Sequence, residues 1–342
     1  MKRRAYLRLA WAAALLFPVL VPPAAAARDI VDMAGRKIEV PDRIEHVYAM
    51  THSFPLVVAV APDLLAGMGW PVQPNRDVLR FLPRGLEGLP LLGTGSDASL
   101  EKMKAVGVDV AFGWPTATEM FPVKQFARIG VPVVFLDVDR LDQYPATFRF
   151  LGRLLHREAR GERLAKKLEE TVAEVRHATA GIPASAKPRV YYAESADGLT
   201  SQCDASPRSE VIVLAGGRNA LHCDGKSPLA DHYTVDIETL LHLDPDVVVV
   251  RFAKTAEAIR ADPRWRHVKA VREGRVYVAP GLPFNWIDRP PSYMRAMGAL
   301  WLAEKLHPNR VRFDLRRETR DFYRDFFGYD LSNADYDKLF AP

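Results

Sequence analysis

The sequence feature that most constrains the fold is a long amphipathic segment at mid-chain, residues 158–178, which reads EARGERLAKKLEETVAEVRHA. Leu164, Leu168, Val172 and Val175 recur at spacings of three and four residues, so they would lie on one face of a helix, with charged residues on the other faces. A helix of this length would span about 30 Å, roughly the diameter of a small lobe. The pattern predicts one long helix, which we call the spine helix.

Two similar segments flank the spine helix. The first, Ser99–Gly113, reads SLEKMKAVGVDVAFG, and the second, Asp236–Val250, reads DIETLLHLDPDVVVV. In each segment a Glu near the start of a short helical stretch is followed eight residues later by an Asp, and then by an apolar run. Two related halves around one helix favour a bilobed protein. The alternative interpretation is a surface helix in a single α/β domain.

Apolar segments typical of buried strands alternate with helical segments in both halves, and this alternation is typical of parallel α/β sheets. We therefore predict an α/β protein of two Rossmann-like lobes joined by the spine helix, with a ligand cleft between the lobes. At 342 residues the chain is long enough for each lobe to have its own core. The expected parts are an N-terminal lobe over 28–140, connecting and spine helices over 141–180, and a C-terminal lobe with C-terminal helices over 181–342.

Residues 1–27 have the pattern of a signal peptide. A basic start precedes an apolar stretch that is too short and too Pro-interrupted to cross a bilayer, and alanines end the segment. We expect an exported, soluble, periplasmic protein, without a lipid anchor because no Cys lies near the cleavage region. The segment holds four of the 47 Lys and Arg residues and none of the 42 Asp and Glu residues. The rest of the chain is therefore nearly neutral, and no nucleic-acid partner is indicated.

The chain has two cysteines, Cys203 and Cys223. In an oxidising compartment a pair in loop-like sequence often forms a disulfide, and closing a loop of about 20 residues would stabilise the fold by roughly 3 kcal/mol. The alternatives are two buried thiols or a soft-metal site, although two Cys without a CxxC spacing are weak evidence for zinc.

The sequence contains no GxSxG, HExxH, P-loop or GxGxxG motif, so no enzyme class is indicated. A binding function is therefore favoured, and clefts between lobes are a usual place for ligands. The loops that follow the strands should line such a cleft, and they contain His52, Trp70, Trp114, Glu194, Arg208, Trp286 and Arg289.

Several of these side chains have a chemistry that suits a ligand. Arg289 and Arg208 could bind an anion, and Trp286 could cover an apolar chelate or ring. Alternatively, Trp286 belongs to the core and Arg289 pairs with Asp288 or Glu304. His52 could ligate a bound metal, or it could serve as a hydrogen-bonding residue at a helix start.

The repeated blocks, together with Leu199–Asn219 and Gly281–Pro308, resemble the helical-backbone class (class III) of periplasmic binding proteins. These proteins serve ABC importers of ferric siderophores, haem, cobalamin and some metals. The resemblance covers nearly all of the chain after residue 28. It implies a monomeric, non-enzymatic protein without an intrinsic cofactor. Such a protein captures an iron-siderophore-type metal complex and delivers it to a permease dimer with its ATPase subunits.

The resemblance also assigns a role to the Glu of each repeated block. In the family this Glu lies on top of its lobe and pairs with arginines of the permease, and the matching residues are Glu101 and Glu238. A carboxylate in the first turn of a helix suits both the helix dipole and docking to arginine. The alternative is a dipole role alone.

Other functions stay open at this point. Within the same class the ligand could be haem, a corrinoid, molybdate or tungstate, or a nickel chelate. A metal chelatase-like enzyme is a different class, and it would use His52 with Glu194 over a planar ligand. A third class is a periplasmic accessory or sensor protein that serves no importer.

Overall fold

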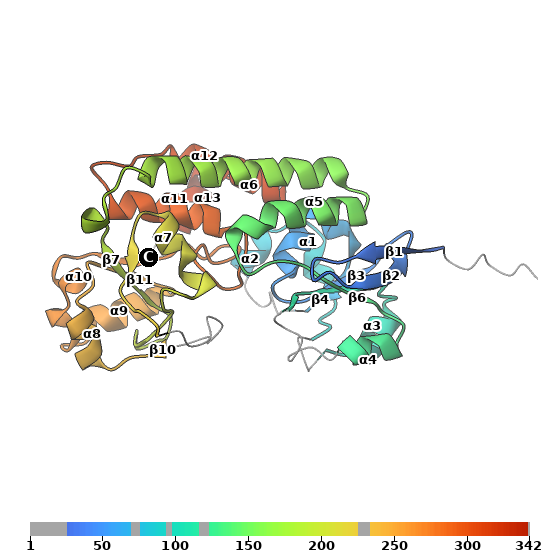
Figure 1. Cartoon of the computed structure of the whole chain (residues 1–342), viewed down its shortest axis with the longest axis horizontal. Coiled ribbons are helices and arrows are strands. Elements are labelled where there is room, and N and C mark those ends of the chain that lie inside the picture. Colours follow the sequence, from blue (N-terminus) through green and yellow to red (C-terminus); the bar gives the residue numbers. More distant parts are fainter. Residues whose placement is uncertain (1–25, 70–75, 94–97, 116–122, 225–232, 341–342) are drawn as a thin grey trace, which may run out of the picture.

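The computed structural model describes residues 26–69, 76–93, 98–115, 123–224 and 233–340. Two α/β lobes lie side by side, and the long helix α6 (Glu158–Thr179) runs along one side of both (Figure 1). The α/β class and the spine helix are thus confirmed, with α6 extending one residue beyond the predicted end. Leu164, Leu168 and Val175 are buried on its inner face, as the apolar periodicity requires.

The N-terminal lobe is built on a four-stranded parallel sheet of order β4-β3-β5-β6. Every residue of these strands is buried, as expected for a sheet covered on both faces. The strands are β3 (Val47–Ala49), β4 (Leu65–Met68), β5 (Val110–Gly113) and β6 (Val133–Phe135). The helices are α1 (Phe54–Val60), α2 (Arg76–Arg80), α3 (Leu100–Ala105) and α4 (Val123–Arg128), and an antiparallel hairpin of β1 (Ala27–Val31) and β2 (Lys37–Pro41) precedes them.

The C-terminal lobe repeats this plan around a parallel sheet of order β12-β11-β7-β9. Its strands are β7 (Arg189–Ala193), β9 (Arg218–Asn219), β11 (Val247–Val250) and β12 (Val276–Val278), beside a short antiparallel pair of β8 (Thr200–Ser201) and β10 (Tyr233–Thr234). The helices are α7 (Glu210–Leu214), α8 (Ile237–Leu243), α9 (Ala253–Ala261), α10 (Lys269–Arg272) and α11 (Arg295–Leu306). The repeated block forms α3 and β5 in one lobe and α8 and β11 in the other.

Helix α5 (Tyr144–Leu154) packs closely against the first half of α6. A Cβ atom at Gly161 would lie 2.4 Å from the Phe148 carbonyl oxygen, and one at Gly152 would lie 3.2 Å from the Gly161 Cα atom. Only glycine allows this approach of two helix backbones. The close contact fixes the direction in which α6 leaves the N-terminal lobe.

The C-terminal tail connects the lobes a second time. It forms α12 (Leu315–Phe327) and α13 (Asn333–Leu339), and α12 contacts α1, α6 and α11. Phe81 of the N-terminal lobe packs edge-on against Tyr323 and Tyr329 of the tail, and Lys338 donates to Asp77 at 2.5 Å. The tail therefore packs on the first lobe, although the chain reaches it from the second. Among the described residues, no helix is long and apolar enough to span a bilayer.

Candidate functional site

The site is the region where residues of the two lobes meet. His52 follows β3 in the N-terminal lobe, and its pKa is lowered to about 3 by burial and then by the charges of Arg208, Arg295 and Arg289. All three arginines belong to the C-terminal lobe. Their combined effect on one imidazole shows that the structure brings together three of the predicted residues, His52, Arg208 and Arg289, and one that the sequence did not single out.

His52 lies flat against Trp114, which follows β5. Their ring centroids are 4.0 Å apart and the planes differ by 21°, and Trp114 is buried. The lowered pKa keeps the imidazole neutral, and its Nδ1 atom has no hydrogen-bond partner among the described residues. A neutral ring with a spare nitrogen can bond to a ligand or ligate a metal. Across the described residues, His52 belongs to no group of three potential metal-ligating side chains.

Arg289 is held by two buried acids. Its Nε atom donates to Glu194 Oε1 at 3.0 Å and lies 3.4 Å from Asp288 Oδ2. Asp288 is fully buried and Glu194 is 5% exposed, whereas the Arg289 side chain keeps 22% of its surface exposed. The predicted alternative, a pair with Asp288, therefore exists, and Glu194 is a second acidic partner.

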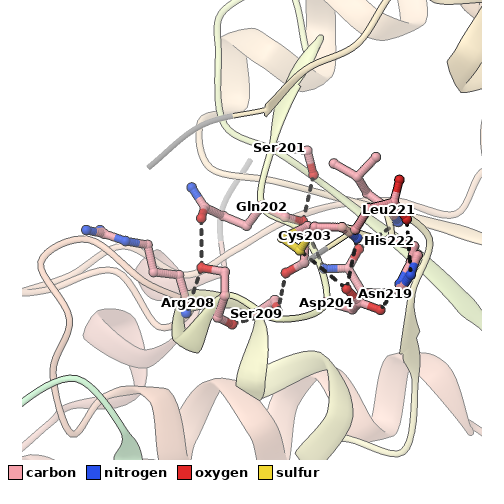
Figure 2. The surroundings of a disulfide bond; sticks show 12 residues. Ser201, Gln202, Cys203, Asp204, Arg208, Ser209, Asn219, Leu221 and His222 are labelled. Carbon is pink, nitrogen blue, oxygen red and sulfur yellow. Dashed lines mark hydrogen bonds and ion pairs between the residues drawn. A yellow bond between two sulfur atoms is a disulfide. The ribbon is translucent and has the colours of Figure 1, made fainter. Parts of the chain in front are cut away.

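A chain of hydrogen bonds links the Arg289 side chain to the backbone of Arg208. Glu194 Oε2 accepts from Gln202 Nε2 at 2.6 Å, and Gln202 Oε1 accepts from Ser206 Oγ at 2.9 Å. Ser206 in turn accepts from the backbone N–H of Arg208 at 3.3 Å, as the cap of a short 3₁₀ turn. Gln202 is fully buried. The two cationic residues are thus positioned by one connected network, and Figure 2 shows Gln202 and Arg208 on the same loop.

A disulfide between Cys203 and Cys223 anchors this loop, with the Cα atoms 5.6 Å apart (Figure 2). Around it, the Cys203 carbonyl accepts from Ser209 Oγ at 2.9 Å, and Asp204 Oδ1 accepts from the backbone N–H of Cys223 at 3.2 Å. His222 adds a bond of 2.7 Å to Asp204. The bridge therefore lies next to Gln202 in sequence and directly supports the turn that carries Arg208.

Arg295 is the site residue that the sequence analysis missed. It begins α11, is fully buried, and pairs with Glu210 of α7 at 2.5 Å. Its guanidinium also donates to the carbonyls of Asp139 at 2.9 Å and Val138 at 3.4 Å, just beyond β6 of the other lobe. Arg295 therefore connects the two lobes. A single Arg at the start of the apolar run AMGALWLA was the available signal.

The predicted role of Trp286 is wrong. Its side chain is fully buried, packs edge-on against Phe340 of the tail, and donates from Nε1 to the Leu282 carbonyl at 3.4 Å. A Cβ atom at Gly298 would lie 1.9 Å from the Trp286 carbonyl oxygen, so α11 covers the same segment from the other side. Trp286 thus belongs to the core instead of a ligand wall. Trp70 lies outside the described residues.

Glu101 and Glu238 occupy equivalent, exposed positions in the two lobes. Each is the second residue of its helix, α3 or α8. The caps are also equivalent, since Ser99 accepts from the Lys102 N–H at 3.3 Å and Asp236 accepts from the Thr239 N–H at 2.7 Å. Both helices lie at the side of the molecule opposite α6 (Figure 1).

Comparison with known proteins gives consistent matches. The family described as periplasmic binding protein matches residues 117–282. A solved ABC transporter solute binding protein from Sulfurospirillum deleyianum is 32% identical with a TM-score of 0.81, covering 92% of this chain and 99% of that one.

The molybdate-binding protein MolA of Haemophilus influenzae is 24% identical, over 91% of this chain and 94% of its own length. The structure of MolA bound to molybdate aligns with a TM-score of 0.76 at 21% identity, covering 89% of this chain and 99% of that chain. At that identity the alignment supports the fold alone.

Proposed function

Since the chain belongs to the family of periplasmic solute-binding proteins of ABC importers, we propose that it captures an anion between its lobes, and that this anion is an oxyanion of the molybdate class. The observation that carries the proposal is the hydrogen-bond network that runs from the Arg289 side chain through Glu194, Gln202 and Ser206 to the backbone of Arg208 and so positions two arginines together. The charges of Arg208, Arg295 and Arg289 also lower the pKa of the buried His52 of the other lobe. Guanidinium groups bind oxyanions through paired, charge-assisted hydrogen bonds. The neutral imidazole adds a hydrogen-bonding group without changing the charge of the site.

Two observations favour a compact oxyanion over a large aromatic or apolar chelate. The loop that was expected to offer an aromatic wall buries Trp286 in the core instead. In addition, MolA, whose name states that it binds molybdate, aligns over nearly the full length of both chains.

An anionic iron-siderophore-type complex is the second candidate. The stacked pair of His52 and Trp114 favours it, because aromatic rings beside the arginines could cover a chelate ring.

The proposal includes the expected cellular setting. Residues 1–27 would direct export, and the protein would act in the periplasm as a monomer without a lipid anchor, an intrinsic cofactor or an enzymatic activity. Its partners would be a permease dimer and the ATPase subunits, with Glu101 and Glu238 as the docking carboxylates. Their exposed, equivalent positions on α3 and α8 support this assignment.

Titration calorimetry on purified protein lacking residues 1–27 tests the ligand. Molybdate and tungstate should bind, sulfate should bind roughly tenfold more weakly or worse, and a ferric catecholate should not compete. Arg208→Gln should weaken molybdate binding by roughly tenfold or more, because it removes one charge-assisted hydrogen-bonding partner of the anion. The matched control is Arg316→Gln, which removes a half-exposed arginine from α12. Binding of the ferric chelate without any oxyanion binding would replace the first candidate by the second.

A further inference from the structure

Two buried carboxylates share one guanidinium in the C-terminal lobe. Glu194 and Asp288 both lie against the Nε atom of Arg289, at 3.0 and 3.4 Å. The Asp288 carboxyl is fully buried and that of Glu194 nearly so. If both acids were ionised, this cluster would carry one net negative charge in a site proposed to take an anion.

One oxygen of the cluster lacks a hydrogen-bond donor. Asp288 Oδ1 accepts from Tyr192 OH at 2.7 Å, and the two Glu194 oxygens accept from Arg289 and Gln202. Asp288 Oδ2 is buried and has no hydrogen-bond partner among the described residues. Buried polar atoms are rarely left in this state. A proton on Oδ2 would resolve it, because Asp288 and Glu194 lie beside the same Arg289 Nε atom and a protonated Asp288 could donate to the Glu194 carboxylate.

We propose, on the basis of the anion-binding function above, that Asp288 and Glu194 hold one proton between them in the liganded protein, and that capture of the anion is coupled to uptake of this proton. Two carboxyl groups in contact cannot both ionise at low cost, so one retains its proton. With that proton in place, the cluster that includes Arg289 is neutral, so its charge no longer opposes the attraction between Arg208 and the ligand.

The charges around Asp288 point to titration near neutral pH. Burial and then the hydrogen bond and charge of Glu194 raise the pKa of Asp288 to about 7, while the Tyr192 hydroxyl and the Arg289 charge act in the opposite direction. Tyr192, on β7, has its own pKa raised by burial, and Arg251 at the end of β11 acts on it in the opposite direction. Across the lobes, His52 has a pKa of about 3. Within this cluster, the pKa of Asp288 is thus raised toward neutral pH, chiefly by burial.

The direction of the coupling follows from linkage. A bound anion favours the protonated carboxyl, and by reciprocity the protonated carboxyl favours the anion. Affinity should therefore be constant below the pKa of the free cluster. Above it, affinity should fall by up to about tenfold for each pH unit.

Calorimetric titration of the protein with molybdate, from about pH 5.5 to about pH 8.5, tests this coupling. Running each pH in two buffers of different ionisation enthalpy gives the number of protons taken up. We expect a dissociation constant that rises up to about tenfold per pH unit above about pH 7, with up to one proton taken up per anion. Asp288→Asn should flatten the profile and abolish proton uptake. The matched control, Asp224→Asn, changes an acid whose side chain is 96% exposed and should retain the wild-type profile.

The possible outcomes separate this inference from the proposed function. If wild-type protein binds no molybdate at any pH, the molybdate assignment fails, and the shared proton is then tested in the free protein. Infrared difference spectra near about pH 6 should show a protonated carboxyl band that Asp288→Asn removes, while Glu194→Gln alters its frequency. The inference would be overturned if the wild-type dissociation constant did not depend on pH, or if Asp288→Asn kept the wild-type slope of that constant against pH. It would also be overturned if the infrared band of the protonated carboxyl were missing.

Discussion

Asp109 and Asp246 make equivalent bonds in the two lobes. Each stands eight residues after the Glu of its repeated block and just before a central strand. Asp109 accepts from the backbone N–H groups of Glu45 and His46 at 2.7 and 2.8 Å, and Asp246 accepts from that of Arg189 at 2.7 Å. In each case the carboxylate fixes the start of the strand that runs parallel beside its own. The sequence repeat therefore corresponds to a repeated structural device.

Removing either carboxylate should destabilise its lobe. Asp246→Ala leaves the Arg189 N–H without its partner and releases Lys269, which bonds to Asp246 at 2.7 Å. We expect a loss of about 1–3 kcal/mol in the free energy of unfolding, and a similar loss for Asp109→Ala. Urea unfolding followed by circular dichroism measures this. Asp224→Ala, at an exposed position, should cost less than about 0.5 kcal/mol, and equal losses in all three variants would contradict the assigned role.

The sequence predicts the elements whose signal is local. The spine helix, the alternation of strands and helices, and the two repeated blocks depend on periodicity and on short-range start signals such as Ser99 and Asp236. The structure reproduces these elements, and the predicted end of the spine helix is off by only one residue.

The missed features depend on contacts between distant segments. Trp286 sits in a Pro-rich loop that looks exposed, and it is buried because the tail, with Phe340, folds over it. Arg295 looks like the start of an ordinary helix, and its partners lie about 85 and 156 residues away in sequence. The orphaned oxygen of Asp288 is likewise visible only once Tyr192, Glu194 and Arg289 are placed around it.

His52 should make the protein sensitive to acid. Its pKa is about 3 in the folded protein because of burial and the nearby arginines, against about 6.5 in an unfolded chain. Between these two pH values, His52 is therefore protonated in the unfolded state and neutral in the folded state. The free energy of unfolding is therefore not reduced by His52 above about pH 6.5. It falls as the pH drops toward about 3, by at most about 1.4 kcal/mol per pH unit.

The test compares melting temperatures between about pH 7 and about pH 4. His52→Gln should reduce the acid-induced loss of stability, since glutamine does not titrate. His177→Gln on α6, an exposed position, should leave the loss as in the wild type. If both variants melt with the wild-type pH dependence, His52 is not the group responsible.

Arg295 should limit the relative motion of the lobes. Its replacement by Met removes the bonds to Val138 and Asp139 and leaves the Glu210 carboxylate, already bonded to the Leu141 N–H, without its buried counter-ion. We expect a loss of about 3–5 kcal/mol in stability and faster amide exchange in the segment after β6.

The exposed pair of Arg316 and Asp337 offers the control for this prediction, because Arg316→Met should cost less than about 1 kcal/mol. Hydrogen exchange by mass spectrometry and urea unfolding report the two effects separately. Similar costs for the two substitutions would show that Arg295 does not hold the lobes together.

The disulfide should contribute to the stability of the C-terminal lobe. It closes a loop with a sequence separation of 20, which corresponds to about 3 kcal/mol in the chain-entropy model. A reductant should therefore lower the melting temperature of the wild type and leave that of the Cys203→Ser, Cys223→Ser double variant unchanged. Anion affinity should also fall in the double variant, because the bridge supports the turn that carries Arg208. A reductant that lowers both melting temperatures equally would argue against a stabilising bridge.

Glu101 and Glu238 give the last prediction, that replacing both by Ala abolishes uptake while ligand affinity stays nearly unchanged. Both are exposed second residues of equivalent helices, and α3 and α8 lie on the same side of the molecule, opposite α6 (Figure 1). A two-fold symmetric permease could therefore engage both carboxylates at once. Each single replacement should reduce uptake less than the double one, because two tethered contacts share an effective concentration. Stability should change by only about 0.5 kcal/mol per site.

Uptake in cells and ligand binding by the purified variant are measured side by side, with Glu170→Ala, Glu257→Ala as a double control at exposed positions on α6 and α9. A parallel loss of ligand affinity and uptake would place these residues in the site or the fold instead of the docking surface.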